Sequence, residues 1–100
     1  MKKKLTNLYL EKLRINKERE DIWDTLVPSL LLIVRKSGKK TWSVRYRIAS
    51  KRFTQKIGIF PNVSLVEARN TARQILAAVD RGENPSEEKR KRNIVISAHN

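Results

Sequence analysis

The stretch TWSVRYRIA, residues 41–49, has the most regular pattern in the chain. Apolar and polar side chains alternate along it without a break. The apolar members are Trp42, Val44, Tyr46 and Ile48, and the polar members are Ser43, Arg45 and Arg47. Successive side chains of a strand point to opposite sides of a sheet. The stretch therefore predicts a strand with one buried side and one solvent-facing, cationic side.

Neighbouring segments also favour strands. We expect a short edge strand over residues 21–24 and longer strands over residues 30–36 and 52–59. Turns are expected at residues 37–40 and 49–51. Within residues 52–59, Phe53 and Ile57 are expected to face inward, on the side of Trp42. Strands joined by connections this short pair antiparallel. The sequence thus predicts a small antiparallel sheet of three to four strands.

A long helix follows the predicted sheet. Ser64 and Glu67 have the spacing of a capping box, in which each side chain bonds the other residue's backbone amide. The helix is expected to end near Arg81, because Gly82 is a natural stop. Its apolar residues recur at helical spacing and form one buried stripe: Leu65, Ala68, Ala72, Ile75, Leu76 and Val79.

A shorter helix is expected near the N-terminus, over residues 7–14, with Thr6 as its cap. A sheet with one apolar side and one amphipathic helix makes a two-layer α+β domain. The sequence therefore predicts an α+β fold, with the sheet packed on one long C-terminal helix. We expect the domain to span residues 1–85, and residues 86–100 to form a charged linker or tail.

Charge is strongly biased along the chain. The 100 residues hold 23 Lys and Arg against 10 Asp and Glu, for a formal net charge of +13. No acidic residue lies between Asp24 and Glu67. A field of one sign is costly by self-repulsion, which a polyanionic partner offsets. Nucleic acid is therefore the first expected partner.

Several function classes are disfavoured by composition. The chain has no Cys and one His, His99. We therefore expect no bound metal, no cofactor and no catalytic site. The longest apolar run, Leu30–Val34, is far shorter than the ~20 residues of a membrane-spanning helix. We expect a non-enzymatic cytoplasmic protein without a membrane or small-molecule partner.

The cationic side of the sheet is the candidate site. A β-ribbon fits the major groove of B-DNA, where Arg can bond both acceptors of guanine and Ser or Thr can bond several base edges. The candidates for base reading are Ser43, Arg45, Arg47, Arg52, Thr54 and Lys56. The candidates for phosphate contact are Lys36, Lys39, Lys40 and Lys51 near the turns, with Arg69 and Arg73 on the long helix. An ordinary solvated sheet face is the alternative.

The order and spacing of several short motifs resemble one family, the N-terminal arm-type DNA-binding domains of tyrosine-recombinase integrases from prophages and genomic islands. The resemblance covers roughly residues 3–90. It rests on Asp24, Val27–Val34, Ser37–Trp42, Arg45–Arg47, Lys51–Arg52, Ile57–Gly58, Phe60–Pro61, Ser64–Arg69 and Gly82–Pro85.

The resemblance implies a specific function. Such domains bind short arm-type sites in double-stranded DNA with the sheet in the major groove, while a separate domain cuts and rejoins strands. Other integrase protomers and accessory DNA-bending or excision proteins are the further partners it implies, at the bacterial nucleoid. Nothing of a catalytic domain is expected here, so the chain looks like an isolated domain of a longer integrase or the product of a truncated gene.

Three positions depart from the family pattern. Leu31 and Ile33 replace a Gly and an Arg on the outward side, and the turn at Ala49 lacks the usual Gly. An outward apolar pair suggests that this strand meets another protein or the N-terminal helix instead of DNA. RNA binding and a protein-interaction module therefore stay open as alternatives. Against RNA, the outward side lacks the aromatic pairs on which single strands stack.

Overall fold

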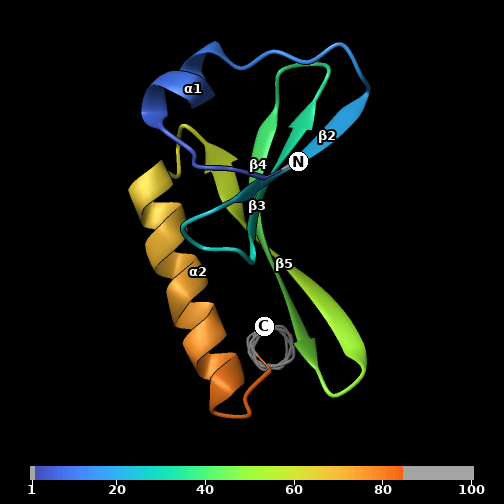
Figure 1. The fold of residues 1–100 in the computed structure, drawn as a ribbon, viewed down its shortest axis with the longest axis vertical. Helices are drawn as coiled ribbons and strands as arrows, with labels where there is room; N and C mark the ends of the chain where they lie inside the picture. Colours follow the sequence, from blue (N-terminus) through green and yellow to red (C-terminus); the bar gives the residue numbers. More distant parts are fainter. Residues whose placement is uncertain (1, 85–100) are drawn as a thin grey trace, which may run out of the picture.

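A computed structural model describes residues 2–84, which form a sheet with helices beside it (Figure 1). The elements in chain order are β1 (Lys2–Lys3), α1 (Asn7–Lys12), β2 (Arg19–Asp24), β3 (Leu30–Arg35), β4 (Lys40–Ile48), β5 (Lys51–Phe60) and α2 (Leu65–Asp80). The sheet order is β1-β2-β3-β4-β5, with β1 parallel to β2 and every other pairing antiparallel. The α+β class is therefore confirmed.

The sheet is larger than the sequence predicts. It has five strands and is mixed, where three to four antiparallel strands were expected. The extra strand, β1, has two lysines, and two residues carry no periodicity that a pattern could detect. β2 begins at Arg19 instead of residue 21, and α1 ends at Lys12 instead of residue 14.

The β4–β5 hairpin is the longest part of the sheet and extends away from α2 (Figure 1). Trp42 pairs with Gly58 and Ser43 with Lys56, so β5 has one extra residue, Ile57, at this point. Such a bulge bends the strand and increases its twist. Beyond it, Phe60 packs its ring edge against the Trp42 ring, with centroids 6.4 Å apart.

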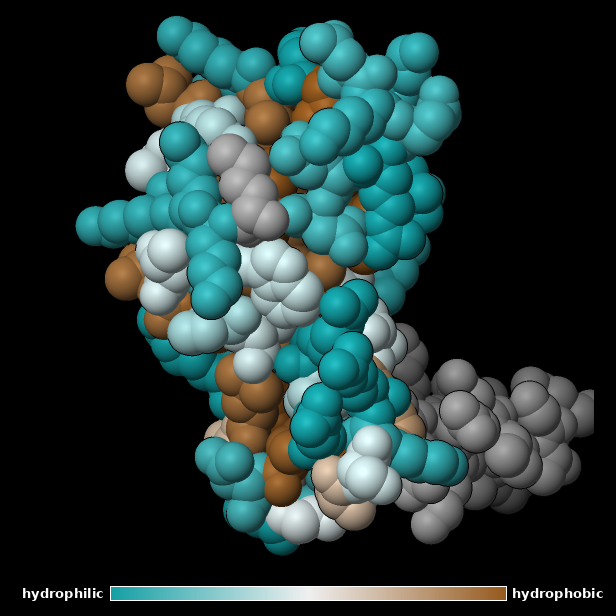
Figure 2. Space-filling view, turned by 45° about the vertical axis from the view of Figure 1, so that its right-hand side comes forward, coloured by the Kyte–Doolittle hydropathy of each residue, from teal (hydrophilic) through white to brown (hydrophobic). Residues whose placement is uncertain are grey.

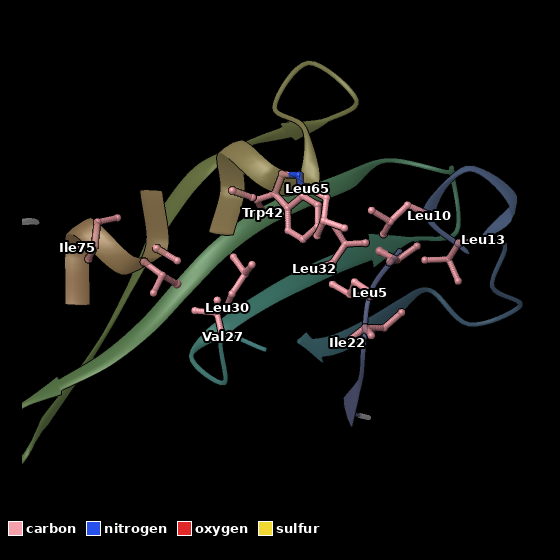
Figure 3. Packing of buried hydrophobic residues seen from close by; sticks show 14 of the residues in the cluster. Leu5, Leu10, Leu13, Ile22, Val27, Leu30, Leu32, Trp42, Leu65 and Ile75 are labelled. Atoms are coloured by element: carbon pink, nitrogen blue, oxygen red, sulfur yellow. The ribbon is translucent and has the colours of Figure 1, made fainter. Parts of the chain in front are cut away.

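The core lies between the sheet and the two helices, with Leu10 of α1 at one end and Ile75 of α2 at the other (Figure 3). Trp42 is fully buried, and its indole nitrogen donates a hydrogen bond of 2.8 Å to the carbonyl of Val63, just before α2. The predicted capping box is present: Ser64 Oγ accepts from the Glu67 amide at 3.2 Å, and Glu67 Oε1 accepts from the Ser64 amide at 3.4 Å. The core and the cap together fix where α2 crosses the sheet.

α2 covers one side of the sheet, which we call the inner side. On the other side, the outer side, no helix of residues 2–84 packs against the sheet. Residues 86–100, expected as a linker or tail, lie outside the described residues. Within residues 2–84 we find no helix that is both long and apolar enough to cross a membrane.

Candidate nucleic-acid interface

The outer side of the β4–β5 hairpin gathers the predicted base-reading residues. They form three cross-strand pairs: Ser43 with Lys56, Arg45 with Thr54, and Arg47 with Arg52. Paired side chains on one side of an antiparallel sheet have Cβ atoms ~4.5–5.5 Å apart. Residues that are up to 13 positions apart in sequence (43 to 56) thus become one continuous surface. We call these six residues the hairpin face.

Arg47 and Arg52 lie directly opposite each other, and both are exposed. Like charges in this position repel and destabilise the sheet. In the part of the chain that the structure describes, neither guanidinium has an ion-pair partner. A shallow depression of about 300 Å³ lies beside them, lined by Ser29, Arg45 and both arginines. An anion placed between the two guanidinium groups would offset their repulsion.

Arg45 is held in place by two neighbours. Its Nε donates a hydrogen bond of 3.2 Å to Thr54 Oγ1, and its guanidinium carbon lies 5.2 Å from the centre of the Trp23 ring. Trp23 belongs to β2 and Arg45 to β4, so the two side chains meet across β3. This cation–π contact restricts the side chain before any ligand binds.

The outward leucine of β3 lies between the two neighbouring strands. Leu31 pairs with Trp23 on one side and with Ser43 on the other, and it is fully buried. Ile33 pairs with Asp21 and Thr41 and is partly buried. The two residues therefore do not form an exposed apolar surface, and Leu31 is covered within the sheet, where β3 lies between β2 and β4, without the expected contact to another protein or to the N-terminal helix.

Ser43 differs from the rest of the hairpin face. It points outward, but only 3% of it is exposed, between Leu31 and Lys56. Little of Ser43 is therefore accessible in the free protein, so it is less available to a base edge than the other five residues, and its role stays a prediction. Arg47, Arg52, Thr54 and Lys56 are exposed, and Arg45 is half-buried.

The β2 part of the outer side has a different chemistry. Asp21 accepts two hydrogen bonds from Arg19, of 2.8 and 3.1 Å, and the Arg19 hydrogen bonds lower the pKa of this carboxyl. Charge here is neutralised within the protein. Figure 2 shows hydrophilic side chains over both the upper and the lower half of this face of the molecule, with apolar side chains between them.

Some of the residues predicted to contact phosphates are exposed, and others are buried or hydrogen-bonded within the protein. Lys36 and Lys39 are exposed in the β3–β4 turn, and Lys51 is exposed at the start of β5, next to the opposite turn. Lys36 has only a weak ion pair, 3.9 Å from Glu18. A strand of nine residues spans ~30 Å, so these lysines lie near the two ends of the sheet.

Arg69 is committed to the fold. Its Nε and Nη2 donate hydrogen bonds of 2.8 and 3.0 Å to the two carboxylate oxygens of Asp24, and Nη2 also donates to the carbonyl of Leu5. Asp24 is 1% exposed and also accepts from the amides of Leu5 and Val27. We call this Asp24–Arg69 network the latch. We therefore withdraw Arg69 as a phosphate contact.

Lys40 and Arg73 lie away from the hairpin face. Lys40 belongs to β4 rather than the turn and has the parity of Trp42, so it points to the inner side and is only 8% exposed. Arg73 is exposed on α2, in the layer opposite the outer side, within 3.5 Å of Asn70. Neither side chain lies on the surface that carries Arg47 and Arg52.

Trp23 is the residue of this surface that sequence reasoning missed. Its position next to Ile22 in a short alternating segment indicates an outward side chain. Its contact with Arg45 follows only from the strand order, which places β3 between them.

The sequence of this chain matches a protein family and a known relative. Residues 3–92 match the family model described as the arm DNA-binding domain. The chain is also 38% identical, over 72 residues, to the prophage integrase IntZ of Escherichia coli K12, an alignment that covers 72% of this chain and 18% of IntZ. The chain thus spans about a fifth of the length of this relative. It belongs to the arm DNA-binding domain family of integrases.

Proposed function

We propose that this domain recognises a specific duplex DNA sequence by placing the β4–β5 hairpin in the major groove. The observation that carries the proposal is the hairpin face itself. Arg45, Arg47, Arg52 and Lys56 lie together on two neighbouring strands, and no acidic residue lies on either strand. A two-stranded ribbon has the width that the major groove admits.

The exposed members of the hairpin face differ in their expected roles. Arg47 and Arg52 are free to place their planar forks against guanine O6 and N7. Arg45 is held by Trp23 and Thr54, so it loses little conformational entropy on binding. Lys36, Lys39 and Lys51 reach the flanking phosphates and set the register of the ribbon.

The family and the relative supply the biological context. We propose that the domain is the N-terminal, non-catalytic module of a tyrosine-recombinase integrase and that its sites are arm-type sites. In that setting, a second integrase protomer and accessory DNA-bending or excision proteins are the partners on neighbouring DNA. The chain's match to a prophage integrase supports this assignment.

The test is fluorescence anisotropy on a randomised duplex pool and on duplexes selected from it, at two salt concentrations. We expect the selected duplexes to bind at least about a hundredfold tighter than the pool. If about six phosphates are neutralised, the slope of log K against log salt is near −5. Equal binding of both samples that disappears at moderate salt would overturn the proposal of sequence recognition.

Duplex RNA of the selected sequence is the matched competitor. Its major groove is deep and narrow, and side chains do not reach the base edges there. We expect it to compete no better than random DNA. Stronger competition by the RNA would favour the RNA-binding alternative.

A further inference from the structure

A second cationic site lies at the other end of β4 from the tip of the hairpin. It is a pocket of about 590 Å³ between α1, the β3–β4 turn and the end of β5. The side chains that matter for its chemistry are Glu11, Arg14, Lys36, Ser37, Lys40 and Phe60. It is distinct from the hairpin face, because Lys40 points to the inner side of the sheet.

Lys40 is the unusual member of this pocket. It is 8% exposed, and its Nζ lies 5.8 Å from the centre of the Phe60 ring. Within residues 2–84, its ammonium group has neither a hydrogen-bond acceptor nor a carboxylate at ion-pair distance. Most of the Lys40 side chain is covered, but its ammonium group is not among the fully buried polar atoms that lack a partner, so it opens into the pocket. Within residues 2–84 its charge is not neutralised by a carboxylate.

The other groups of the pocket add to this positive potential. Burial lowers the pKa of Lys40, and the charge of Arg14 lowers it further, so the two cations repel each other. Lys36 contributes a third, mostly exposed cation, and Ser37 contributes a hydroxyl. Among residues 2–84, Glu11 is the single carboxylate that lines the pocket. Three cations against one carboxylate form a cradle for a small anion with several acceptor oxygens.

We propose that this pocket binds one phosphate group of the DNA backbone, on the duplex whose major groove holds the hairpin. The inference deepens the proposed function and rests on it. Lys40 and Arg47 are seven residues apart on β4, which corresponds to ~23 Å. The phosphate therefore lies beyond the base pairs that the hairpin face contacts, within one turn of B-DNA, ~34 Å.

The pocket is tested first with inorganic phosphate alone. Thermal unfolding is measured in phosphate and in chloride at equal ionic strength for the wild type, Lys40→Met, Arg14→Gln and Lys17→Gln. Lys17 is the matched control, because it is exposed and does not line the pocket. We expect phosphate to raise the Tm of the wild type and Lys17→Gln most, to raise it less in Arg14→Gln, and to raise it least in Lys40→Met, where the cations of the hairpin face remain. An equal rise in the wild type and Lys40→Met, or no rise in the wild type, would overturn the proposal.

The source of the phosphate is tested with duplexes that carry one uncharged methylphosphonate at a time. One position near the end of the site should weaken wild-type binding about tenfold. Lys40→Met should bind the unmodified duplex about tenfold more weakly and lose its sensitivity to that position, while Lys17→Gln keeps it. Equal sensitivity of Lys40→Met and the wild type at every position would overturn the DNA assignment and leave a site for free phosphate.

The two proposals fail in distinguishable ways. Loss of sequence preference in the anisotropy measurement removes the proposed function and the DNA-backbone assignment together. The melting difference between phosphate and chloride is measured without DNA, so it reports on the pocket independently.

Discussion

The latch and the hairpin face both contain arginine, but the arginine of the latch is paired with a carboxylate and the opposed arginines of the hairpin face are not. At the latch, Arg69 meets a buried carboxylate, and every hydrogen bond from its guanidinium goes to the protein. On the hairpin face, Arg47 and Arg52 face each other in solvent with no acid beside them. The paired arginine joins distant parts of the chain, whereas the unpaired arginines leave a positive surface whose repulsion an external anion would offset.

Breaking the latch should have the largest effect. Arg69→Met leaves the Asp24 carboxylate buried without its cation, and the free energy of unfolding should fall by about 3–5 kcal/mol. Urea unfolding measures it. The control is Asp21→Asn, which breaks the partly exposed pair with Arg19 and should cost less than about 1 kcal/mol. Equal losses in the two variants would contradict the distinction between these pairs.

The latch also predicts a pH dependence. Burial acts to raise the pKa of Asp24, but the hydrogen bonds from Arg69 and from the Leu5 amide outweigh it, so the pKa lies below its ordinary value. Stability from this group is therefore present above about pH 4 and is lost as pH falls further. We expect stability to fall more steeply below about pH 4 in the wild type than in Asp24→Asn, as measured by urea unfolding at several pH values. Parallel profiles would show that Asp24 does not contribute.

Removing a hairpin arginine should leave the fold intact and weaken DNA binding. Arg47→Ala should cost roughly 1–3 kcal/mol on a selected duplex and relax the preference at one base pair. Lys39→Ala should weaken selected and scrambled duplexes about equally and reduce the salt slope by about 1. Anisotropy on both duplexes separates the two behaviours. If Arg47→Ala weakened both duplexes equally, its role would be that of a phosphate contact.

Trp23 offers a sharper test of preorganisation. Trp23→Leu removes the ring over which the Arg45 guanidinium lies, and it should weaken selected binding by about 0.5–1 kcal/mol. The loss should vanish in an Arg45→Ala background, because the two residues then no longer interact. An equal loss in both backgrounds, measured by the same double-mutant cycle, would mean that Trp23 acts independently of Arg45.

The smallest expected effect separates hairpin stability from binding. Ala49 has a φ of 55°, in the left-handed region that favours glycine. Ala49→Gly removes the steric cost of the left-handed conformation, about 1–2 kcal/mol. Glycine also raises the entropy of the unfolded chain, which offsets part of this gain, so the free energy of unfolding should rise by less than about 1 kcal/mol. Urea unfolding measures the gain, and DNA affinity should not change. A net loss of stability would show that the turn is not strained.

Local patterns predicted most of the fold. Alternation in residues 41–49 and the spacing of Ser64 and Glu67 gave β4 and the start of α2, because both signals lie within a few residues. The latch joins residues 45 positions apart, so no window of the sequence contains it. β1 is equally invisible, since its two residues gain their strand geometry only by pairing with β2.

Only the part of the candidate site that depends on local patterns could be predicted from the sequence. The six residues of the hairpin face follow from two alternating strands and the turn between them. The burial of Ser43 does not, because it depends on Leu31 of a third strand. Lys40 was assigned to the turn, although its even spacing from Trp42 indicates the inner side once the strand is known to begin there.

The central claim is that the hairpin face contacts base edges in the major groove, and base analogues test it most directly. In a selected duplex, 7-deazaguanine removes the N7 acceptor of the major groove, and inosine removes the amino group of the minor groove. We predict that 7-deazaguanine at one or more guanines weakens wild-type binding, that inosine does not, and that Arg47→Ala or Arg52→Ala abolishes the 7-deazaguanine effect. Binding that responds to inosine and ignores 7-deazaguanine would contradict the account.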